Sequence, residues 1–128
     1  MSYKILAINP GSTSTKIAVY DDDVPTFSLS IPHSAEELKP FARVADQFHW
    51  RKDLIEKALA DNGINIRELS AVIGRGGIIS PIESGVYEVN DDLVRDLHNA
   101  RMQHATAAYH GRQLARDIAD EIGVKSYI

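Results

Sequence analysis

The residues best equipped for chemistry stand together near the amino terminus. The segment 9–16 reads Asn-Pro-Gly-Ser-Thr-Ser-Thr-Lys. Gly11 can take backbone angles that bring its amide close to an anion, and successive amides of such a turn form a concave nest of donors. The hydroxyls that follow it add donors, Lys16 adds a positive charge, and Asn9 offers a neutral oxygen to Mg²⁺ or one of its waters. We therefore predict a phosphate site formed by Asn9, Gly11, Ser12, Thr13, Ser14 and Lys16.

The Walker P-loop is the obvious alternative for such a segment, and it does not fit. The pattern G-x-x-x-x-G-K-[ST] requires Gly before the Lys, where this chain has Thr15. It also requires a helix afterwards, whereas 17–20 reads Ile-Ala-Val-Tyr, which is typical of a strand. The anion would therefore be held by a hairpin turn. A plain polar turn without a ligand remains the alternative.

Short strands must position this turn. Residues 3–8 form a mostly apolar run that fits a buried strand, and 16–20 form a second one, which ends at the acidic triplet 21–23. Residues 25–31 alternate with period two, as a half-exposed third strand does. Three short strands joined by tight turns predict an antiparallel meander.

Helices and further strands follow the meander. Ser34 and Glu37 have the spacing of a capping box, and a longer helix is predicted over about 44–62, with Gly63 as its C-cap. A fourth strand covers 71–73, and 86–89 is a short extended piece. The remaining predictions are a helix capped by Asn90, a helix that contains 114–122 and ends at Gly123, and a strand that starts at Val124. The predicted order is β-β-β-α-β-α-α-β.

Composition narrows the class of protein. The 128 residues suffice for one domain, and 44% hydrophobic and 25% charged residues are typical of a soluble globular protein. No apolar run reaches the roughly 20 residues of a membrane span, and the absence of cysteine excludes disulfides and thiolate chemistry. Because the net charge is −4 and no basic stripe is present, a nucleic-acid partner is not expected. We expect a cytoplasmic protein.

The turn also resembles a known motif. The segment 8–16 closely resembles the opening motif of butyrate kinases, in the acetate and butyrate kinase family of the actin-like ATPase fold. Further motifs in the same order extend the resemblance up to about His104. They are His33-Ser34-Ala35-Glu36-Glu37-Leu38, Asp46-Gln47-Phe48, Arg51-Lys52-Asp53, Arg75-Gly76-Gly77 with Pro81, Gly85-Val86-Tyr87, and His104-Ala105.

The resemblance implies a fold and a reaction. The fold would be an α/β lobe of the actin-like ATPase (ribonuclease H-like) class, with a mixed sheet flanked by helices. The reaction would be transfer of phosphate from ATP to a short-chain carboxylate such as butyrate, with Mg²⁺, giving ADP and an acyl phosphate. Asn9 would lie near the metal and phosphates, Ser12 and Ser14 would contact phosphate, and Lys16 would assist nucleotide binding. His104 would border the active cleft, and the full-length enzyme would form a homo-oligomer.

Arg75 is the predicted catalytic residue. Phosphoryl transfer to an ionised carboxylate depends on positioning and on neutralising negative charge, and a guanidinium can bind two oxygens at once. Gly76 and Gly77 leave room for a ligand, and Pro81 could help to form an apolar wall for the alkyl tail. The predicted substrate contacts are therefore Arg75, Gly76, Gly77 and Pro81, and the resemblance adds His104. An arginine that only binds backbone carbonyls at a strand end is the alternative.

Two departures from the family bear on this prediction. The loop after His104-Ala105 reads Thr-Ala-Ala-Tyr, where butyrate kinases usually have Ser-Asn-Leu-Gly, and family members are more than twice as long. We therefore interpret residues 1–128 as the first lobe of a longer kinase, inactive by itself. Two other functions stay open: a non-catalytic lobe that binds nucleotide or self-associates through an open sheet edge, and a sugar kinase or chaperone-type ATPase with the same hairpin.

Overall fold

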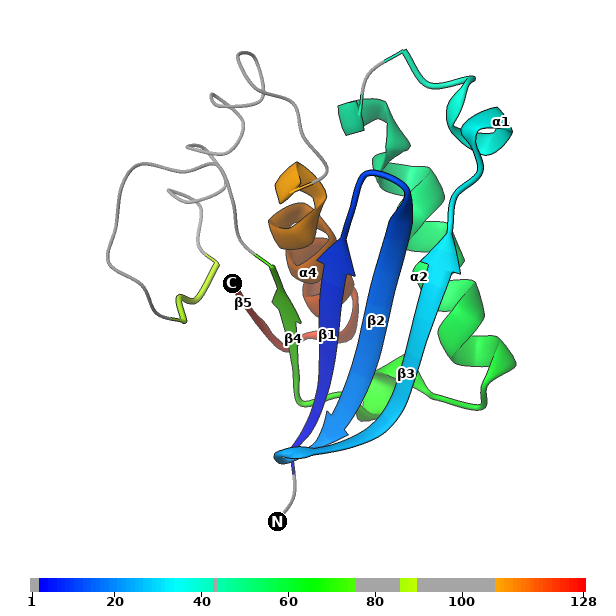
Figure 1. Cartoon of the computed structure of the whole chain (residues 1–128). Coiled ribbons are helices and arrows are strands. Elements are labelled where there is room, and N and C mark those ends of the chain that lie inside the picture. Colours follow the sequence, from blue (N-terminus) through cyan, green and yellow to red (C-terminus); the bar gives the residue numbers. More distant parts are fainter. Residues whose placement is uncertain (1–2, 43, 76–85, 90–107) are drawn as a thin grey trace.

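The computed structural model describes residues 3–42, 44–75, 86–89 and 108–128, which are built on a five-stranded sheet in the order β3-β2-β1-β4-β5 (Figure 1). Its strands are β1 (Lys4–Pro10), β2 (Ser14–Asp21), β3 (Val24–Pro32), β4 (Ala71–Gly74) and β5 (Lys125–Tyr127). Strands β1, β2 and β3 pair antiparallel, whereas β4 is parallel to both β1 and β5. The predicted mixed sheet with an antiparallel three-strand meander is therefore confirmed.

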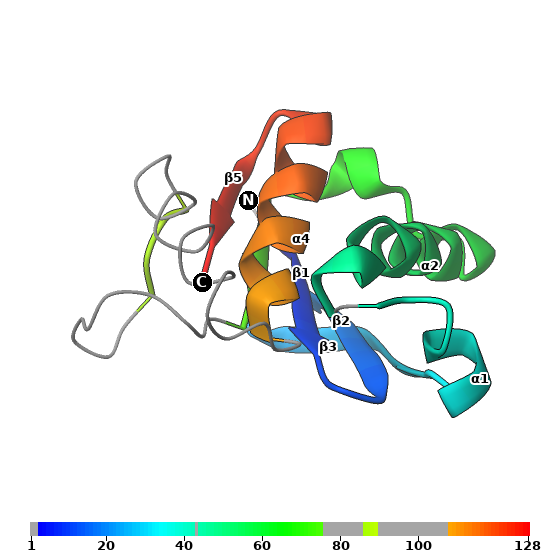
Figure 2. The same ribbon diagram turned by 90° about the horizontal axis from the view of Figure 1, so that it is seen from above.

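Period-two alternation in the strands separates two faces of the sheet. Leu6 and Ile8 of β1 and Ile17 and Val19 of β2 are buried on one face, which α2 (Phe48–Asp61) and α4 (Ala108–Ile122) cover from the same side (Figure 2). In-between residues such as Ala7 point to the opposite face. This second face, called the open face below, is not covered by any helix of the described chain, so a ligand can reach it.

The predicted start of α1 agrees with the structure, whereas the predicted start of α2 does not. The capping box before α1 (Ala35–Leu38) is present, with reciprocal hydrogen bonds between Ser34 and Glu37 of 3.0 and 3.1 Å. The helix predicted over 44–62 begins later, because a 3₁₀ turn, η1 (Val44–Gln47), precedes α2. Gln47 keeps a helical backbone and makes no side-chain cap, so no capping signal marked this boundary.

The carboxyl-terminal part also follows the prediction. Helix α4 buries Leu114, Ala115, Ile118 and Ala119 and ends before Gly123, whose φ is 77°. A second 3₁₀ turn, η2 (Ile66–Glu68), leads into β4. The predicted extended piece at 86–89 lies along β5, with a hydrogen bond of 2.8 Å from the Val89 amide to the Ser126 carbonyl. The helix predicted after Asn90 lies outside the described residues.

Acidic and basic side chains join α2 to α4. The Lys52 ammonium lies 2.7 Å from Asp117 and 3.5 Å from Glu121. Beside it, burial first and then the hydrogen-bonded Glu121 raise the pKa of Glu56 to about 7, whereas that hydrogen bond lowers the pKa of Glu121. Glu56 Oε1 is also buried without a hydrogen-bond partner. At neutral pH, Glu56 therefore keeps a proton for much of the time and donates it to the Glu121 carboxylate.

The Glu56–Glu121 pair predicts a pH-dependent stability. The folded pKa of Glu56 lies above its ordinary value of 4.5, so its contribution is complete below 4.5 and is lost as the pH rises through about 7. Partial exposure of Glu56 and the opposite shift of Glu121 reduce the net loss to about 1 kcal/mol. Glu56→Gln keeps a donor that cannot ionise. We expect it to melt several degrees above the parent at pH 8 and within a degree or so of it at pH 5.

Thermal melts at pH 5 and 8 test this prediction. The control is Glu36→Gln, which removes an exposed carboxylate from α1. A difference between Glu56→Gln and the parent that does not change with pH would contradict a shared proton.

Candidate functional site

The predicted phosphate-binding segment forms the β1–β2 hairpin turn. Pro10 and Thr15 are the last paired residues of the two strands, and the Gly11 amide donates to the Ser14 carbonyl at 2.7 Å. Ser12 and Thr13 stand exposed at the tip, and within the described residues neither of their backbone amides has a hydrogen-bond partner. Two free amides and their neighbouring hydroxyls form the kind of donor cluster that binds phosphate oxygens.

Gly11 differs from its expected use. Its amide closes the turn, and its φ is not positive, because the only described glycines with positive φ are Gly63 and Gly123. The free amides belong to the next two residues. Gly11 therefore shapes the turn, and in this conformation its own donor is not available to an anion.

A row of polar side chains crosses the open face beside the turn. Asn9 is the cross-strand partner of Lys16 on β2. On its other side lies Arg75, because Ile8 pairs with Gly74 in the parallel ladder and the Arg75 amide donates to the Ile8 carbonyl at 2.9 Å. With strands about 4.8 Å apart, the backbones of Lys16 and Arg75 are separated by about 10 Å. The positively charged side chains of Lys16 and Arg75 thus flank the side-chain amide of Asn9 at the end of the sheet.

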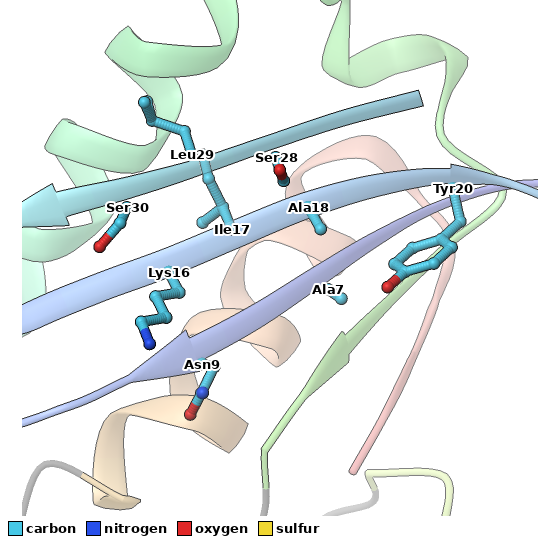
Figure 3. Close-up of a pocket in the computed structure, with 9 residues that line it drawn as sticks. All are labelled: Ala7, Asn9, Lys16, Ile17, Ala18, Tyr20, Ser28, Leu29 and Ser30. Atoms are coloured by element: carbon cyan, nitrogen blue, oxygen red, sulfur yellow. The ribbon is translucent and has the colours of Figure 1, made fainter. Parts of the chain in front are cut away.

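Figure 3 shows the groove next to this row. The side chains of Asn9 and Lys16 project side by side from neighbouring strands, while the ring of Tyr20 lies toward the other end of the groove. The groove has a volume of about 400 Å³ and no acidic residue in its lining. Within the described chain, Lys16 has no ion-pair partner. An anion would therefore meet an unneutralised charge at this position.

A second cavity of about 380 Å³ lies on the Arg75 side of Asn9. Its wall is mostly apolar and comes from β1, β4, the 86–89 segment and the end of the chain. The lining residues are Ala7, Ile8, Asn9, Ile73, Gly74, Arg75, Val86 and Ile128. The cavity can accept a small molecule with an apolar tail and an anionic head.

A buried polar network lies behind the turn, on the helix side. Arg51 of α2 is only 1% exposed. Its Nη1 donates to the Thr15 hydroxyl at 3.0 Å and to the Ser14 carbonyl at 3.3 Å, while Nε and Nη2 donate to Gln47 at 3.1 and 2.9 Å. His33 Nε2 lies 2.8 Å from the same Thr15 hydroxyl. Burial and then the nearby Arg51 charge lower the pKa of His33, which keeps its imidazole neutral near pH 7.

Several predicted site residues are brought together and others are not described. Asn9, Lys16 and Arg75 form the row, and the turn residues Gly11 to Ser14 stand beside it. The predicted substrate contacts Gly76, Gly77, Pro81 and His104 lie outside the described residues. The sequence analysis missed the network of Thr15, His33, Gln47 and Arg51, although one signal was visible. Arg51 interrupts the apolar stripe of Phe48, Ile55 and Leu59 on α2, and a charge at such a position requires buried partners.

The donor set fits a polyphosphate better than a metal held by protein alone. Among the residues that the structure describes, no group of three or more His, Asp or Glu side chains could hold an ion. Asn9 provides one neutral oxygen. Because Mg²⁺ typically keeps several waters and takes its other ligands from phosphates, the residues present fit a Mg²⁺–nucleotide complex.

Comparisons with known proteins identify relatives of the chain. No family model matches the sequence. Over all 128 residues the chain is 44% identical to a probable butyrate kinase from Clostridium botulinum. Over 127 residues it is 46% identical to butyrate kinase 1 from Clostridium acetobutylicum. The chain is related to butyrate kinases. It covers 36% and 35% of these two relatives, so it spans about a third of their length.

Solved structures confirm the fold. The chain superposes on acetate kinase from Entamoeba histolytica with a TM-score of 0.60 at 12% identity, covering 97% of this chain and 35% of that one. A propionate kinase from Francisella tularensis gives a TM-score of 0.52 at 14% identity, covering 98% of this chain and 36% of that one. The predicted actin-like ATPase lobe is therefore confirmed. None of the helices in the described ranges combines the length and apolar character needed to cross a membrane.

Proposed function

We propose that the chain is the nucleotide-phosphate-binding lobe of a longer kinase that transfers phosphate from ATP to a short-chain carboxylate such as butyrate. One observation carries the proposal. The hairpin turn presents two unbonded amides beside the Lys16–Asn9–Arg75 row, on a face of the sheet that the described helices leave open. The similarity to butyrate kinases supports the choice of acceptor. We expect such an enzyme to act in the cytoplasm.

The parts of the site have distinct roles in this proposal. The turn amides and Lys16 would hold the β- and γ-phosphates, and Asn9 would meet the Mg²⁺ ion or one of its waters. When bound, the metal would supply charge neutralisation on the phosphates. Arg75 would hold the acceptor carboxylate near the γ-phosphate, with the alkyl tail against Ile73 and Val86 in the second cavity. An ionised carboxylate needs no general base, so positioning and charge carry the reaction.

A comparison of two proteins tests the proposal. The first is the 128-residue chain and the second is the product of the complete reading frame that contains it. In a coupled assay for ADP, we expect butyrate-dependent turnover from the second and none from the first, because the chain spans about a third of its relatives. Butyrate-dependent ADP formation by the chain alone would contradict the interpretation as one lobe. A complete product without carboxylate kinase activity would contradict the reaction.

A further inference from the structure

Arg51 is a buried charge without an acidic partner among the residues that the structure describes. All four hydrogen bonds of its guanidinium end on neutral oxygens, those of Gln47, Ser14 and Thr15. No ion pair is recorded for it in the described part of the chain. Charged side chains are almost never fully buried unless they are paired, and removing a charge from water is costly. No ion pair within the described residues offsets the desolvation free energy of the Arg51 charge.

The network also determines which way the carbonyl groups of the turn face. The Ser14 carbonyl accepts from the Gly11 amide and from Arg51, and the Thr13 carbonyl accepts from the His33 amide at 2.8 Å. Both carbonyls are thus engaged within the protein. Because carbonyl oxygens repel phosphate oxygens, a turn that binds an anion must direct its carbonyls away from the ligand and its amides toward it.

Burial fixes the charge state of the network. Arg51 donates to the Thr15 hydroxyl, whose oxygen also lies 2.8 Å from His33 Nε2. Burial and then the neighbouring Arg51 charge lower the pKa of His33, so its imidazole is neutral near pH 7. The network therefore carries one positive charge, on Arg51, in a dry environment where its field is weakly screened.

We propose that Arg51 is a positioning residue for polyphosphate binding. It fixes Ser14 and Thr15 from behind the turn, and its unpaired charge is neutralised by the phosphates that bind on the other side. This inference rests on the proposed function, which places polyphosphate at the turn. The ligand class is a linear polyphosphate, free or as part of a nucleotide. A longer, more highly charged phosphate chain should benefit most from Arg51.

The test uses tripolyphosphate with Mg²⁺ as the probe and calorimetric titration of the 128-residue chain as the measurement. Arg51→Met removes the charge and keeps much of the apolar volume. We expect it to bind tripolyphosphate about tenfold more weakly, with a smaller loss for inorganic phosphate. Arg51→Lys restores the charge without the planar fork and should recover part of the affinity. The control Arg67→Met removes an exposed arginine from η2, at the opposite end of the sheet, and should change the affinity less than twofold.

The choice of ligand separates this role from a merely structural one. Arg51→Met leaves the buried acceptors of Gln47 and Thr15 without their donor, so it should melt below the parent whatever its role in binding. A merely structural loss would weaken phosphate and tripolyphosphate alike, whereas loss of the Arg51 charge should weaken tripolyphosphate more. If Arg51→Met does not fold, ¹⁵N spectra of the parent chain decide. Tripolyphosphate should shift the Ser12 and Thr13 amides and the Arg51 Nε–H resonance, and an unmoved Nε–H signal at saturation would overturn the proposal.

The outcomes distinguish a failure of the proposed role of Arg51 from a failure of the proposed function. If the parent chain binds tripolyphosphate and Arg51→Met binds it equally well, the role of Arg51 is refuted and the proposed function stands. If the parent chain does not bind tripolyphosphate at all, both fail. A loss of affinity that is equal for phosphate and tripolyphosphate would refute the charge argument.

Discussion

Replacing Gly111 by alanine should destabilise the protein, although alanine is the better helix former. Gly111 of α4 meets the end of β4 so closely that an added Cβ would overlap the Arg75 carbonyl oxygen and lie 3.1 Å from its carbon. The helix or the strand must move, which costs about 3 kcal/mol in a packed core. The gain in helix propensity is only about 1 kcal/mol. We therefore expect a net loss of about 2 kcal/mol and a melting temperature lower by roughly 8 °C.

The same contact can be tested from the strand. A Cβ on Gly74 would overlap the Gly111 carbonyl oxygen and lie 3.2 Å from the Ala115 methyl group, so Gly74→Ala should be at least as damaging. The matched control is Gly11→Ala, where the nearest atoms to the new methyl carbon are 3.4 and 3.6 Å away and φ is not positive. Its melting temperature should stay within about 2 °C of the parent. Thermal melts of the three variants decide, and an unchanged or raised value for Gly111→Ala would contradict the close contact.

This contact matters for the site because it fixes Arg75. A methyl group at position 111 would overlap the carbonyl oxygen of Arg75. The backbone amide of Arg75 also donates a hydrogen bond to the Ile8 carbonyl. Helix α4 and strand β1 thus hold the arginine backbone from two sides, while its side chain stays exposed on the open face. A shift of α4 would therefore move the end of the Lys16–Asn9–Arg75 row.

Local patterns in the sequence were enough to predict most of the fold. The mostly apolar run 3–8 was correctly predicted as a buried strand, which buries Leu6 and Ile8. The hydroxyl-rich segment between two strands was correctly predicted as a turn. Period and capping signals depend on neighbours a few residues apart, which the sequence displays directly. The start of α2 was misplaced because a 3₁₀ turn continues the helical pattern without a cap.

Features that depend on long-range packing could not be predicted in this way. Alternation alone puts Thr15 on the helix side of the sheet, but its partners lie 18 and 36 residues away. Gly74 and Gly111 touch only because a parallel strand and a helix cross at that point. Likewise, the Gly11 amide was expected to bind an anion. In the structure it donates a hydrogen bond to the Ser14 carbonyl, because the turn closes on itself.

Arg75 should be the most sensitive position for catalysis. In the product of the complete reading frame, we expect Arg75→Ala to lower kcat/KM for butyrate by about 10²–10³, the range seen when one preorganised charge stabiliser is removed. Arg75→Lys should recover only part of the loss, because an ammonium group cannot bind two carboxylate oxygens in the bidentate geometry of a guanidinium. The measurement is steady-state ADP formation with butyrate and ATP varied separately.

The structure argues that this loss would not be a folding defect. The Arg75 side chain is exposed and has no hydrogen bond or ion pair with the rest of the described residues, which weighs against an arginine that only caps strand carbonyls. The hydrogen bond from its backbone amide to the Ile8 carbonyl survives any substitution except proline. The variant should therefore melt with the parent, and so should the control Arg67→Ala, which should also keep full activity.

The kinetic constants show which part of the role Arg75 performs. If it only holds the carboxylate before reaction, KM for butyrate should rise while kcat and KM for ATP stay constant. If it also neutralises charge between carboxylate and γ-phosphate during transfer, kcat must fall as well, since only an interaction that is stronger in the transition state accelerates the step. We expect both changes, with the larger one in kcat, because the two anions approach each other most closely in the transition state. If the Arg75→Ala enzyme keeps the parental kcat, Arg75 only binds the carboxylate. Lys16, on the other side of Asn9, would then be the residue that stabilises charge in the transition state.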